Sequence, residues 1–519
     1  MSFKERFGMS PVAMISVVLG VFMAILDNTV VNVAIPKMMS VFAASQNEIQ
    51  WVVTAYMLVT GMLTPVSGYL GDRFGQKRVY LFALAVFTLG SAMAGFAWST
   101  DTMIAFRVFQ AVGGAMLMPT SMAIMFSMSP PERRGTIMGI WGIALMFAPA
   151  LGPTLSGYLV EYVDWRLIFY INVPIGILSF FLVSASLPAM KGSKTEKLDV
   201  WGFATSLIGF FSLLYALSEA PSDGWGSPTI MAFLFLAVVF LSLFVAVELT
   251  TESPMLDLRL LGRRVFLTAT ITSSLISVAM LGVLFILPVF LQDSLGLSPL
   301  QTGLLTLPGA IVTAITMPIS GYLFDRFGAR ALGILGLAIT VITSVFYTYL
   351  NVNWTFSMIM VLYTLRSLGM GLTMMPVSTA GLNDVPKHLV SRGTALQNTT
   401  RNVAGSIGTA YLSTVMQTGA SSDFVRFTGR LSLQNLQLLH SSVMPSVFGV
   451  TSSGLLSNLV SYLDGVAFQT GMQAALIVSV IVATLAFVSV FFIGKKRLPA
   501  ELQQGGHARP KSPIAATAE

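Results

Sequence analysis

The stretch Gly68-Tyr-Leu-Gly-Asp-Arg-Phe-Gly75 recurs, with one change, as Gly321-Tyr-Leu-Phe-Asp-Arg-Phe-Gly328. Only 10% of the 519 residues are charged, so a charged segment that occurs twice is informative. Both copies fall where a short loop is expected to join two apolar runs. The repeat indicates that two halves of the chain descend from one unit. Duplicated halves around a central site are the usual construction of secondary transporters.

Composition places the chain among integral membrane proteins. Hydrophobic residues make up 55% of the sequence, and the mean hydropathy of +0.79 is far above that of soluble proteins. The chain has no cysteine, which excludes disulfides, thiolate metal sites and cysteine nucleophiles. Its three histidines, His388, His440 and His507, fall in predicted loops far apart in sequence. No metal site is therefore expected.

The apolar runs predict an all-α polytopic membrane protein with fourteen transmembrane helices. Each run is close to the roughly 20 residues that a helix needs to cross a bilayer, and a β-barrel would show short alternating segments instead. The expected spans cover residues 13–34, 50–70, 80–98, 103–127, 135–158, 166–187, 199–217, 228–249, 266–291, 302–322, 332–350, 356–377, 392–416 and 470–493.

Basic side chains predict the orientation of these helices. Most of the 29 Lys and Arg residues fall on one side of the predicted membrane, in both terminal segments and in alternate loops. Cytoplasmic loops carry such an excess, so both termini are expected in the cytoplasm of a multi-pass protein of the inner or plasma membrane. The formal charge of +7 then reflects topology, and nucleic-acid binding is not expected.

Further paired motifs extend the repeat through both halves. Arg134-Gly-Thr recurs as Arg392-Gly-Thr, and Arg107, followed by Met-Pro, is matched by Arg366, again followed by Met-Pro. The separations between matched residues are nearly constant. Spans one to six are therefore expected to correspond to spans nine to fourteen, with spans seven and eight inserted between them.

The repeat predicts four parts of the chain. Residues 1–190 form an N-terminal six-helix bundle, residues 191–262 form two inserted helices with linkers, and residues 263–497 form a C-terminal six-helix bundle. The second bundle contains a long outer loop at 417–469. An amphipathic helix or hairpin at the membrane interface and a mobile loop are both open for this segment. Residues 498–519 are expected to be a disordered cytoplasmic tail.

Several motifs resemble those of a known family. The segment from Gly68 to Arg78 resembles the loop motif of the major facilitator superfamily. The run from Leu26 to Pro36, Leu-Asp-Asn-Thr-Val-Val-Asn-Val-Ala-Ile-Pro, is similar to the first-helix motif of its fourteen-helix drug:proton antiporter branch, the EmrB/QacA type. Phe106-Arg-Val-Phe-Gln-Ala-Val-Gly-Gly114 resembles the fourth-helix motif of that branch. The motifs cover nearly the whole chain.

This resemblance implies a proton-coupled multidrug efflux transporter, an antiporter that exports lipophilic or amphiphilic compounds by alternating access. It implies no cofactor beyond a proton gradient. The expected partners are small amphiphilic substrates, protons and the lipid bilayer, with a periplasmic adaptor protein where the host has an outer membrane. No Gly-x-x-x-x-Gly-Lys phosphate-binding motif occurs, so ATP is not the expected fuel.

Other functions remain open at this stage. They are proton-coupled export of a specific metabolite such as a siderophore or a peptide, and transport by an uncoupled uniporter. An intramembrane hydrolase or transferase is disfavoured because the spans contain no second acid, no histidine partner and no set of metal ligands. The chain is therefore not expected to be an enzyme.

An acidic residue inside the first span is the main candidate for proton coupling. Burying a carboxylate such as Asp27 costs about 2.5–3.5 kcal/mol on insertion scales, so it should face a cavity or a partner. Arg107, inside span four, is the natural cation. We expect Asp27 to exchange protons while Arg107 tunes it, with a purely structural ion pair as the alternative. Glu219, at the outer end of span seven, is a second candidate, with a solvated interfacial acid as its alternative.

The two loop motifs supply candidate gating residues. Glycine permits close helix approach and tight turns, aspartate can accept hydrogen bonds from a neighbouring helix N-terminus, and arginine can reach carboxylates or carbonyls. The resemblance implies that the cluster latches the two halves together on the cytoplasmic side. The candidate latch residues are Gly68, Asp72, Arg73, Gly75, Arg78, Asp325 and Arg326.

Span five is similar to the antiporter helix of the family. Its prolines free backbone carbonyls and favour kinks, and its glycines permit close packing. Such a helix suits an exchanger that must not leak. The residues are Gly142, Pro149, Gly152, Pro153 and Gly157, and Ser156 departs from the family pattern, which usually has glycine there.

Span thirteen carries polar residues in place of these prolines and glycines. The difference suggests proton handling in the first half and substrate contact in the second, with interhelical hydrogen bonding as the alternative for the amides. An unpaired arginine there would be costly, which leaves anionic or zwitterionic cargo open. The candidate cavity residues are Asn32, Gln397, Asn398, Arg401 and Asn402.

Overall fold

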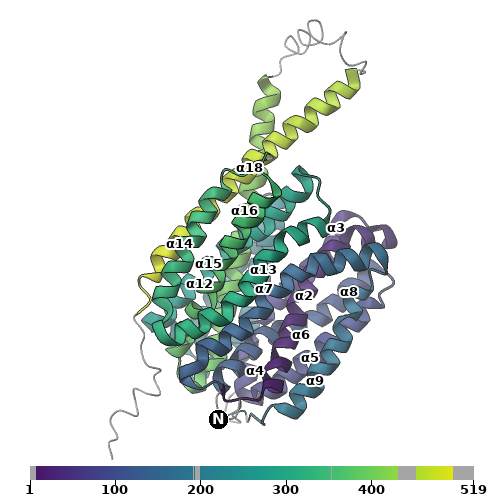
Figure 1. Ribbon diagram of the computed structural model, residues 1–519. Coiled ribbons are helices and arrows are strands. Elements are labelled where there is room, and N and C mark those ends of the chain that lie inside the picture. Colours follow the sequence, from purple (N-terminus) through teal and green to yellow (C-terminus); the bar gives the residue numbers. More distant parts are fainter. Residues whose placement is uncertain (1–6, 191, 193–198, 352, 431–451, 495–519) are drawn as a thin grey trace, which may run out of the picture.

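A computed structural model describes residues 7–190, 192, 199–351, 353–430 and 452–494, and all regular structure within these residues is helical. Figure 1 shows two groups of long helices side by side, one from the first half of the sequence in purple to blue and one from the second half in green to yellow. The predicted all-α class is confirmed.

The first half supplies long helices and short connectors. They are α2 (Pro11–Phe42), α3 (Gln46–Leu63), α4 (Val66–Phe74), α5 (Gln76–Gly95), α6 (Thr100–Met128), η1 (Pro131–Arg133), α7 (Arg134–Tyr162), α8 (Leu167–Tyr170) and α9 (Asn172–Ser186). Helices α3 and α4 meet at an angle of 55°. The bend falls at Pro65, which cannot continue a regular hydrogen-bond ladder.

Two helices follow before the second half begins. The inserted pair is α10 (Val200–Asp223) and α11 (Pro228–Thr250). The remaining elements are η2 (Leu258–Gly262), α12 (Arg264–Val289), η3 (Phe290–Ser294), α13 (Pro299–Phe327), α14 (Ala329–Tyr347), α15 (Phe356–Asn383), η4 (Lys387–Leu389), α16 (Val390–Arg430) and α18 (Ser452–Val490).

Serine side chains fix the start of three long helices. Ser45, Ser99 and Ser298 each form a capping box with the residue three positions later. In this arrangement the two side chains satisfy each other's free backbone N–H groups. All three serines lie in loops on the predicted outer side of the membrane.

The last glycine of each repeated segment forms a tight turn between helices. Gly75 and Gly328 have φ angles of 88° and 79°, a region that side chains disfavour. A Cβ atom on Gly75 would also overlap the carbonyl oxygen of Met190. Glycine at these two positions is therefore required by the turn itself.

The number of spans agrees only in part with the prediction of fourteen. Helices lie at every predicted position, but twelve are long and apolar enough to cross a membrane by themselves, or thirteen with the bent pair α3–α4. The predicted thirteenth span, 392–416, lies within α16, which does not meet this criterion. Its amides and arginine reduce its hydropathy, although it packs among α4, α6, α10, α12 and α18.

The segment 417–469 is largely a continuation of the two helices that flank it. Helix α16 extends to Arg430 and α18 begins at Ser452, and Figure 1 shows both ends projecting beyond the rest of the bundle. The apolar runs end before the helices do, because a helix satisfies its own backbone groups in water as well as in lipid. The predicted loop is therefore shorter than expected. Residues 431–451 and the predicted tail 498–519 lie outside the described residues.

Candidate functional site

Asp27 and Arg107 form a buried ion pair in the first half. Arg107 Nη1 lies 2.5 Å from Asp27 Oδ2, and the exposed fractions of the two side chains are 1% and 0%. Asp27 comes from α2 and Arg107 from α6, the pairing that the sequence predicts for an intramembrane carboxylate. The pair is completely removed from water in this conformation.

Two amide side chains complete the coordination of the Asp27 carboxylate. Its Oδ1 accepts hydrogen bonds from Gln110 Nε2 at 3.1 Å and from Asn172 Nδ2 at 2.9 Å. The Gln110 oxygen also accepts from Arg107 Nη1 at 2.7 Å, so this amide contacts both charges. Asn172 Nδ2 donates in addition to Ser91 Oγ at 3.1 Å. Helices α2, α6 and α9 thus meet at one carboxylate, and α5 joins them through Ser91.

The guanidinium of Arg107 is held by further contacts. Its Nε donates to the carbonyl oxygen of Val52 at 3.3 Å. The ring of Tyr56 lies 4.1 Å from the guanidinium carbon, where the ring face stabilises a cation. Both residues belong to α3, so the second span also contributes to the site.

Glycine permits the close packing that positions this network. Gly90 on α5 lies against the backbone of Gln110 on α6, and a Cβ atom on Gly90 would be 2.6 Å from Gln110 Cα. A side chain there would force the two helices apart. Ser91, the next residue, donates to the carbonyl oxygen of Phe169 at 2.9 Å, which fixes α5 against the connector before α9.

The surroundings of Asp27 decide whether its carboxyl group is charged. Burial disfavours the charged form, whereas a cation and hydrogen-bond donors favour it. Removing one partner of a buried pair costs about 3–5 kcal/mol because an uncompensated charge remains. Any movement that withdraws a helix from the network therefore changes the balance between burial and pairing at the Asp27 carboxylate.

Glu219 is not part of this network. It lies near the outer end of α10, is half-buried, and has Tyr215 and Asp223 within electrostatic range. Among the described residues, no contact connects it to Asp27 or Arg107. Its assignment to proton coupling stays a prediction.

The second half contains the counterpart of Arg107 without the counterpart of Asp27. Arg366 on α15 is buried and donates to the carbonyl oxygen of Ala279 at 2.6 Å and to Ser344 Oγ. No acidic side chain of the described residues lies within ion-pair distance of it. The intramembrane carboxylate is thus confined to one of the two halves.

The predicted cavity residues divide between two faces of α16. Gln397 turns toward α15 of its own half, where its Oε1 accepts from Ser378 Oγ at 2.7 Å. Asn398 and Arg401 turn toward α6 of the other half: Arg401 Nη2 lies 2.7 Å from Asn398 Oδ1 and 3.5 Å from Met118 Sδ.

The remaining two cavity candidates differ in exposure. Asn402 is half-buried, and Asn32 on α2 is exposed, with its amide donating to the carbonyl oxygen of Asn28 at 3.4 Å. No contact among the described residues brings Asn32 to the polar residues of α16. Arg401 and Asn398 are therefore the members of this set that lie at the boundary between the halves.

Asp325 of the second loop motif connects the two halves. Its Oδ1 accepts from the Gly135 N–H at 2.9 Å, and its Oδ2 accepts from the Thr136 N–H at 2.9 Å and the Thr136 hydroxyl at 2.7 Å. Nearby, Arg134 Nη1 donates to Asn383 Oδ1 at 3.1 Å. A carboxylate from one half thus caps the N-terminus of α7 in the other.

Asp72 of the first motif also connects the two halves. Its Oδ2 lies 3.1 Å from Arg392 Nε near the start of α16, and Gln76 Nε2 donates to Ser391 Oγ at 2.8 Å. The ion pair joins Asp72 to the first turn of α16. Its predicted role as an acceptor for a neighbouring helix N-terminus stays a prediction.

The first glycine of each motif lies where helices of the two halves cross. A Cβ atom on Gly321 would overlap the carbonyl oxygen of Gly135, and one on Gly68 would lie 2.8 Å from the Cβ of Ala395. With both latches formed, the two halves are in contact on the predicted cytoplasmic side.

The arginines of the motifs contact aromatic rings near them in sequence. Arg73 Nη1 donates to the Tyr69 hydroxyl at 2.9 Å, and the Arg326 guanidinium carbon lies 4.6 Å from the ring centre of Tyr322. Arg78 is exposed.

Helix α7 packs against both α2 and α13 through its glycines. A Cβ atom on Gly152 would overlap Thr29 Oγ1 of α2, and one on Gly142 would lie 2.7 Å from Met375 Cγ and 2.8 Å from Met317 Sδ. The α7–α13 contact is the most extensive between the two halves. The glycines thus allow close packing, and the role of this helix in an antiporter stays a prediction.

Other residues of the antiporter motif are less constrained. Pro149 and Pro153 lie within α7, which is assigned as one continuous helix. A Cβ atom on Gly157 would lie 3.9 Å from Leu300, an ordinary contact. Ser156 is buried, and its hydroxyl donates to the carbonyl oxygen of Gly152 at 2.7 Å, so the departure from glycine is accommodated within the helix.

Sequence reasoning missed several members of these sites. Asn172 and Ser91 were not considered, although an amide inside an apolar span is an unusual residue that could have been flagged. The statement that the spans contain no second acid was wrong, because Glu248 near the end of α11 is fully buried. At the end of an apolar run a carboxylate looks interfacial, and its burial is not visible in sequence.

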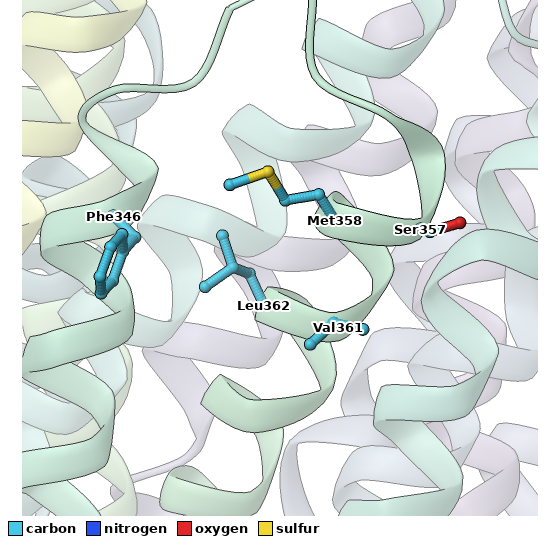
Figure 2. A pocket seen from close by; sticks show the side chains of 5 residues that line it. All are labelled: Phe346, Ser357, Met358, Val361 and Leu362. Atoms are coloured by element: carbon cyan, nitrogen blue, oxygen red, sulfur yellow. The ribbon is translucent and has the colours of Figure 1, made fainter.

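An open apolar groove lies elsewhere, on the second half. Figure 2 shows Phe346 of α14 facing Met358 and Leu362 of α15, with Ser357 and Val361 beside them. The groove has a volume of about 380 Å³. Ser357 is its one polar lining residue, and none of its residues belongs to the Asp27 network.

The sequence and fold match known transport proteins. Residues 17–409 match the sequence profile described as Major Facilitator Superfamily. The chain is 42% identical to the uncharacterized MFS-type transporter YhcA of Bacillus subtilis, over 84% of this chain and 82% of that protein. It is 34% identical to the lincomycin resistance protein LmrB of Listeria innocua, over 77% and 84% of the two chains.

Two further comparisons agree with this match. The chain is 31% identical to the multidrug resistance protein B homolog of Mycobacterium tuberculosis, over 77% of this chain and 75% of that protein. The fold is similar to that of the proton:xylose symporter XylE, with a TM-score of 0.60 and 15% identity over 95% and 98% of the two chains. These relatives are consistent with the predicted drug:proton antiporter branch. The chain is therefore a multi-pass membrane transporter rather than an enzyme, and it belongs to the major facilitator superfamily.

Proposed function

We propose that this transporter exports lipophilic or amphiphilic compounds in exchange for protons, and that Asp27 is the group that binds the proton. The two six-helix bundles, residues 1–190 and 263–497, would alternate between cytoplasm-facing and outward-facing forms. No cofactor is needed in this scheme, since the proton gradient supplies the energy.

The buried Asp27–Arg107 pair is the observation that carries the proposal. The carboxylate lies within a transmembrane helix, is inaccessible to water in the latched conformation, and receives its hydrogen bonds from α6 and α9. Intramembrane acids are expensive and mark ion or proton pathways. A change in the packing of these helices would alter the balance between desolvation and ion pairing, and so load or release a proton.

The contacts between the halves support alternating access. The Asp325 and Asp72 latches lie on one side of the bundle and include exchangeable hydrogen bonds and an ion pair. Such contacts can form in one state and break in another. We place this latched side in the cytoplasm because the basic loops lie there.

The gradient is sufficient for useful export. One elementary charge that moves through 100 mV supplies about 2.3 kcal/mol. At about 1.4 kcal/mol for each tenfold change in concentration, one proton supports a substrate gradient of well over tenfold. The cargo class follows from two relatives whose names refer to lincomycin resistance and multidrug resistance.

A transport assay on reconstituted protein tests this proposal. Proteoliposomes that hold the full chain are given a proton gradient, and uptake of ethidium and of lincomycin is followed with and without an uncoupler. We expect gradient-driven transport of at least one probe by the natural protein and its loss in Asp27→Asn. The matched control is Asp101→Asn, because Asp101 is an exposed acid at the start of α6.

The possible results separate the candidate functions. Transport that the uncoupler does not affect would indicate a uniporter. Normal gradient-driven transport by Asp27→Asn would remove Asp27 from the mechanism. A failure of all probes, together with proton-driven transport of a siderophore or a peptide, would favour a dedicated metabolite exporter.

A further inference from the structure

A second pair of buried acids lies outside the Asp27 network, on the inserted helices. Asp199 caps the start of α10, and Glu248 lies near the end of α11. The exposed fractions of the two residues are 9% and 0%. Both lie at the end of the inserted pair that faces the latched side of the bundle, and the function proposed above uses neither.

In each of these carboxyl groups, one oxygen accepts a hydrogen bond and the other has no hydrogen-bond partner. Asp199 Oδ1 accepts from the Gly202 N–H at 2.8 Å, and Glu248 Oε2 accepts from the Leu256 N–H at 3.0 Å. The other two atoms, Asp199 Oδ2 and Glu248 Oε1, are buried and have no hydrogen-bond partner. A buried polar atom without a partner is costly, so two at one place require an explanation.

The two unpartnered oxygens lie beside the same glycine. A Cβ atom on Gly202 would overlap Asp199 Oδ2 and would lie 3.0 Å from Glu248 Oε1. The two oxygens are therefore no more than 5.4 Å apart, a range in which one carboxylate disfavours charge on the next. A proton held between them would remove that repulsion and give both oxygens a partner.

We propose that Asp199 and Glu248 share one proton and form a second protonation site of this transporter, on the inserted helices. The other charged groups that face Glu248 are Asp257, before η2, and Arg392, on α16. Asp257 adds negative charge, and its Oδ1 already accepts from the Arg259 N–H at 3.2 Å. The one cation in this set, Arg392, is paired with a different carboxylate.

That pairing couples the site to the latch. Arg392 lies 3.1 Å from Asp72 of the first half. The cation that acts electrostatically on Glu248 is therefore also part of the latch between the halves. When the latch opens, the charge of Arg392 is no longer shared with Asp72, and the proton affinity of the Asp199–Glu248 pair changes. By reciprocity, protonation of the pair biases the latch. This inference does not depend on the role proposed for Asp27.

Infrared difference titration of the full-length protein in lipid nanodiscs tests the shared proton. The natural protein is compared with Glu248→Gln and Asp199→Asn. Gln keeps an acceptor for the Leu256 N–H, and Asn is as good a helix cap as Asp, so both variants keep the local hydrogen bonds. Glu252→Gln is the matched control, because Glu252 is an exposed acid close by.

A single shared proton predicts one specific pattern. The carboxylic acid C=O band present near neutral pH should be lost in both Glu248→Gln and Asp199→Asn and unchanged in Glu252→Gln. Its persistence in both variants overturns the proposal, and so does its loss in only one of them, since that result assigns the proton to a single residue.

A distance measurement tests the coupling to the latch and separates it from Asp27. The chain has no native cysteine, so spin labels can be placed by Phe74→Cys and Phe327→Cys, at exposed and equivalent positions of the two loop motifs. In an Asp27→Asn background the label distance should still change with pH, and Glu248→Gln should abolish that change. An unaltered pH response in the double variant overturns the coupling, whatever the assay of Asp27 gives.

Discussion

The Asp325 carboxylate accepts a hydrogen bond from the Gly135 N–H at 2.9 Å, across the boundary between the two halves of the chain. Two more hydrogen bonds reach it from the backbone and the hydroxyl of Thr136. The N-terminus of a helix has unpaired N–H groups and a partial positive charge. Helix α7 therefore lacks a complete cap unless the second half supplies one. The cap is present when the latch is closed and is lost when the latch opens.

Asp325→Ala should favour the form that is open at the latch. Hydrogen bonds to a charged group contribute about 1.5–3 kcal/mol each, and the substitution removes three of them. We expect the Phe74→Cys and Phe327→Cys spin labels to move apart in most molecules. Asp384→Ala is the control, because its ion pair with Arg263 at 3.8 Å is partly exposed and joins residues of one half. Equal distances in Asp325→Ala and the natural protein would contradict the capping role.

Gly321→Ala should prevent the latch from closing. A Cβ atom there would overlap the Gly135 carbonyl oxygen of α7, a backbone atom that cannot rotate away. Gly71→Ala is a matched control: its Cβ would lie 3.5 Å from Ser391, an ordinary contact, and the second motif has Phe324 at the equivalent position. Proton-driven transport should fall at least tenfold in Gly321→Ala and little in Gly71→Ala. Similar activity of the two variants would show that close approach is not required.

The fold was predictable from sequence because its determinants are local. Long apolar runs specify membrane helices, and the repeated loop motif specifies the pairing of the halves. The helical ends at 417–430 and 452–469 were not predictable in this way. They lie beyond the apolar runs, where hydropathy no longer distinguishes a helix from a loop.

The site was predictable only in part because its contacts are long-range. An acid and a base inside membrane spans must find partners, which identifies Asp27 and Arg107. Nothing in the sequence shows that Asn172, far along the chain, reaches the same carboxylate, or that Asp325 caps helix α7 of the other half. These contacts depend on how the helices are rotated about their axes.

Arg107→Gln should destabilise the protein more than the double variant Asp27→Asn with Arg107→Gln. The single substitution leaves the Asp27 carboxylate buried without its cation, at a cost of about 3–5 kcal/mol. The double substitution leaves two neutral amides that can bond to Gln110 and Asn172. Thermal unfolding in detergent measures the difference, and the double variant should have the higher Tm. A lower Tm for the double variant would mean that the charge of Asp27 is compensated by another group.

Arg401→Gln should change the charge preference of transport. Arg401 lies at the boundary between the halves, is buried, and contacts Asn398 and Met118, and no acidic side chain of the described residues forms an ion pair with it. A buried cation favours anionic cargo and disfavours cationic cargo. We expect the ratio of ethidium to carboxyfluorescein transport to rise about tenfold, equivalent to 1.4 kcal/mol. Arg401→Lys keeps the charge and should keep the ratio. An unchanged ratio in Arg401→Gln would show that cargo does not sense this residue.

Asn172→Ala should shift the pH profile of transport without abolishing transport. Asn172 donates to Asp27 Oδ1 at 2.9 Å, and losing a donor to a carboxylate makes protonation more favourable. The whole pH profile of transport should therefore move upward. Ser91→Ala is the matched control, since Ser91 accepts from the same amide at 3.1 Å but does not touch the carboxylate. A purely structural role for Asn172 predicts the opposite pattern: both variants would lower the maximal rate and leave the pH at half-maximal rate unchanged.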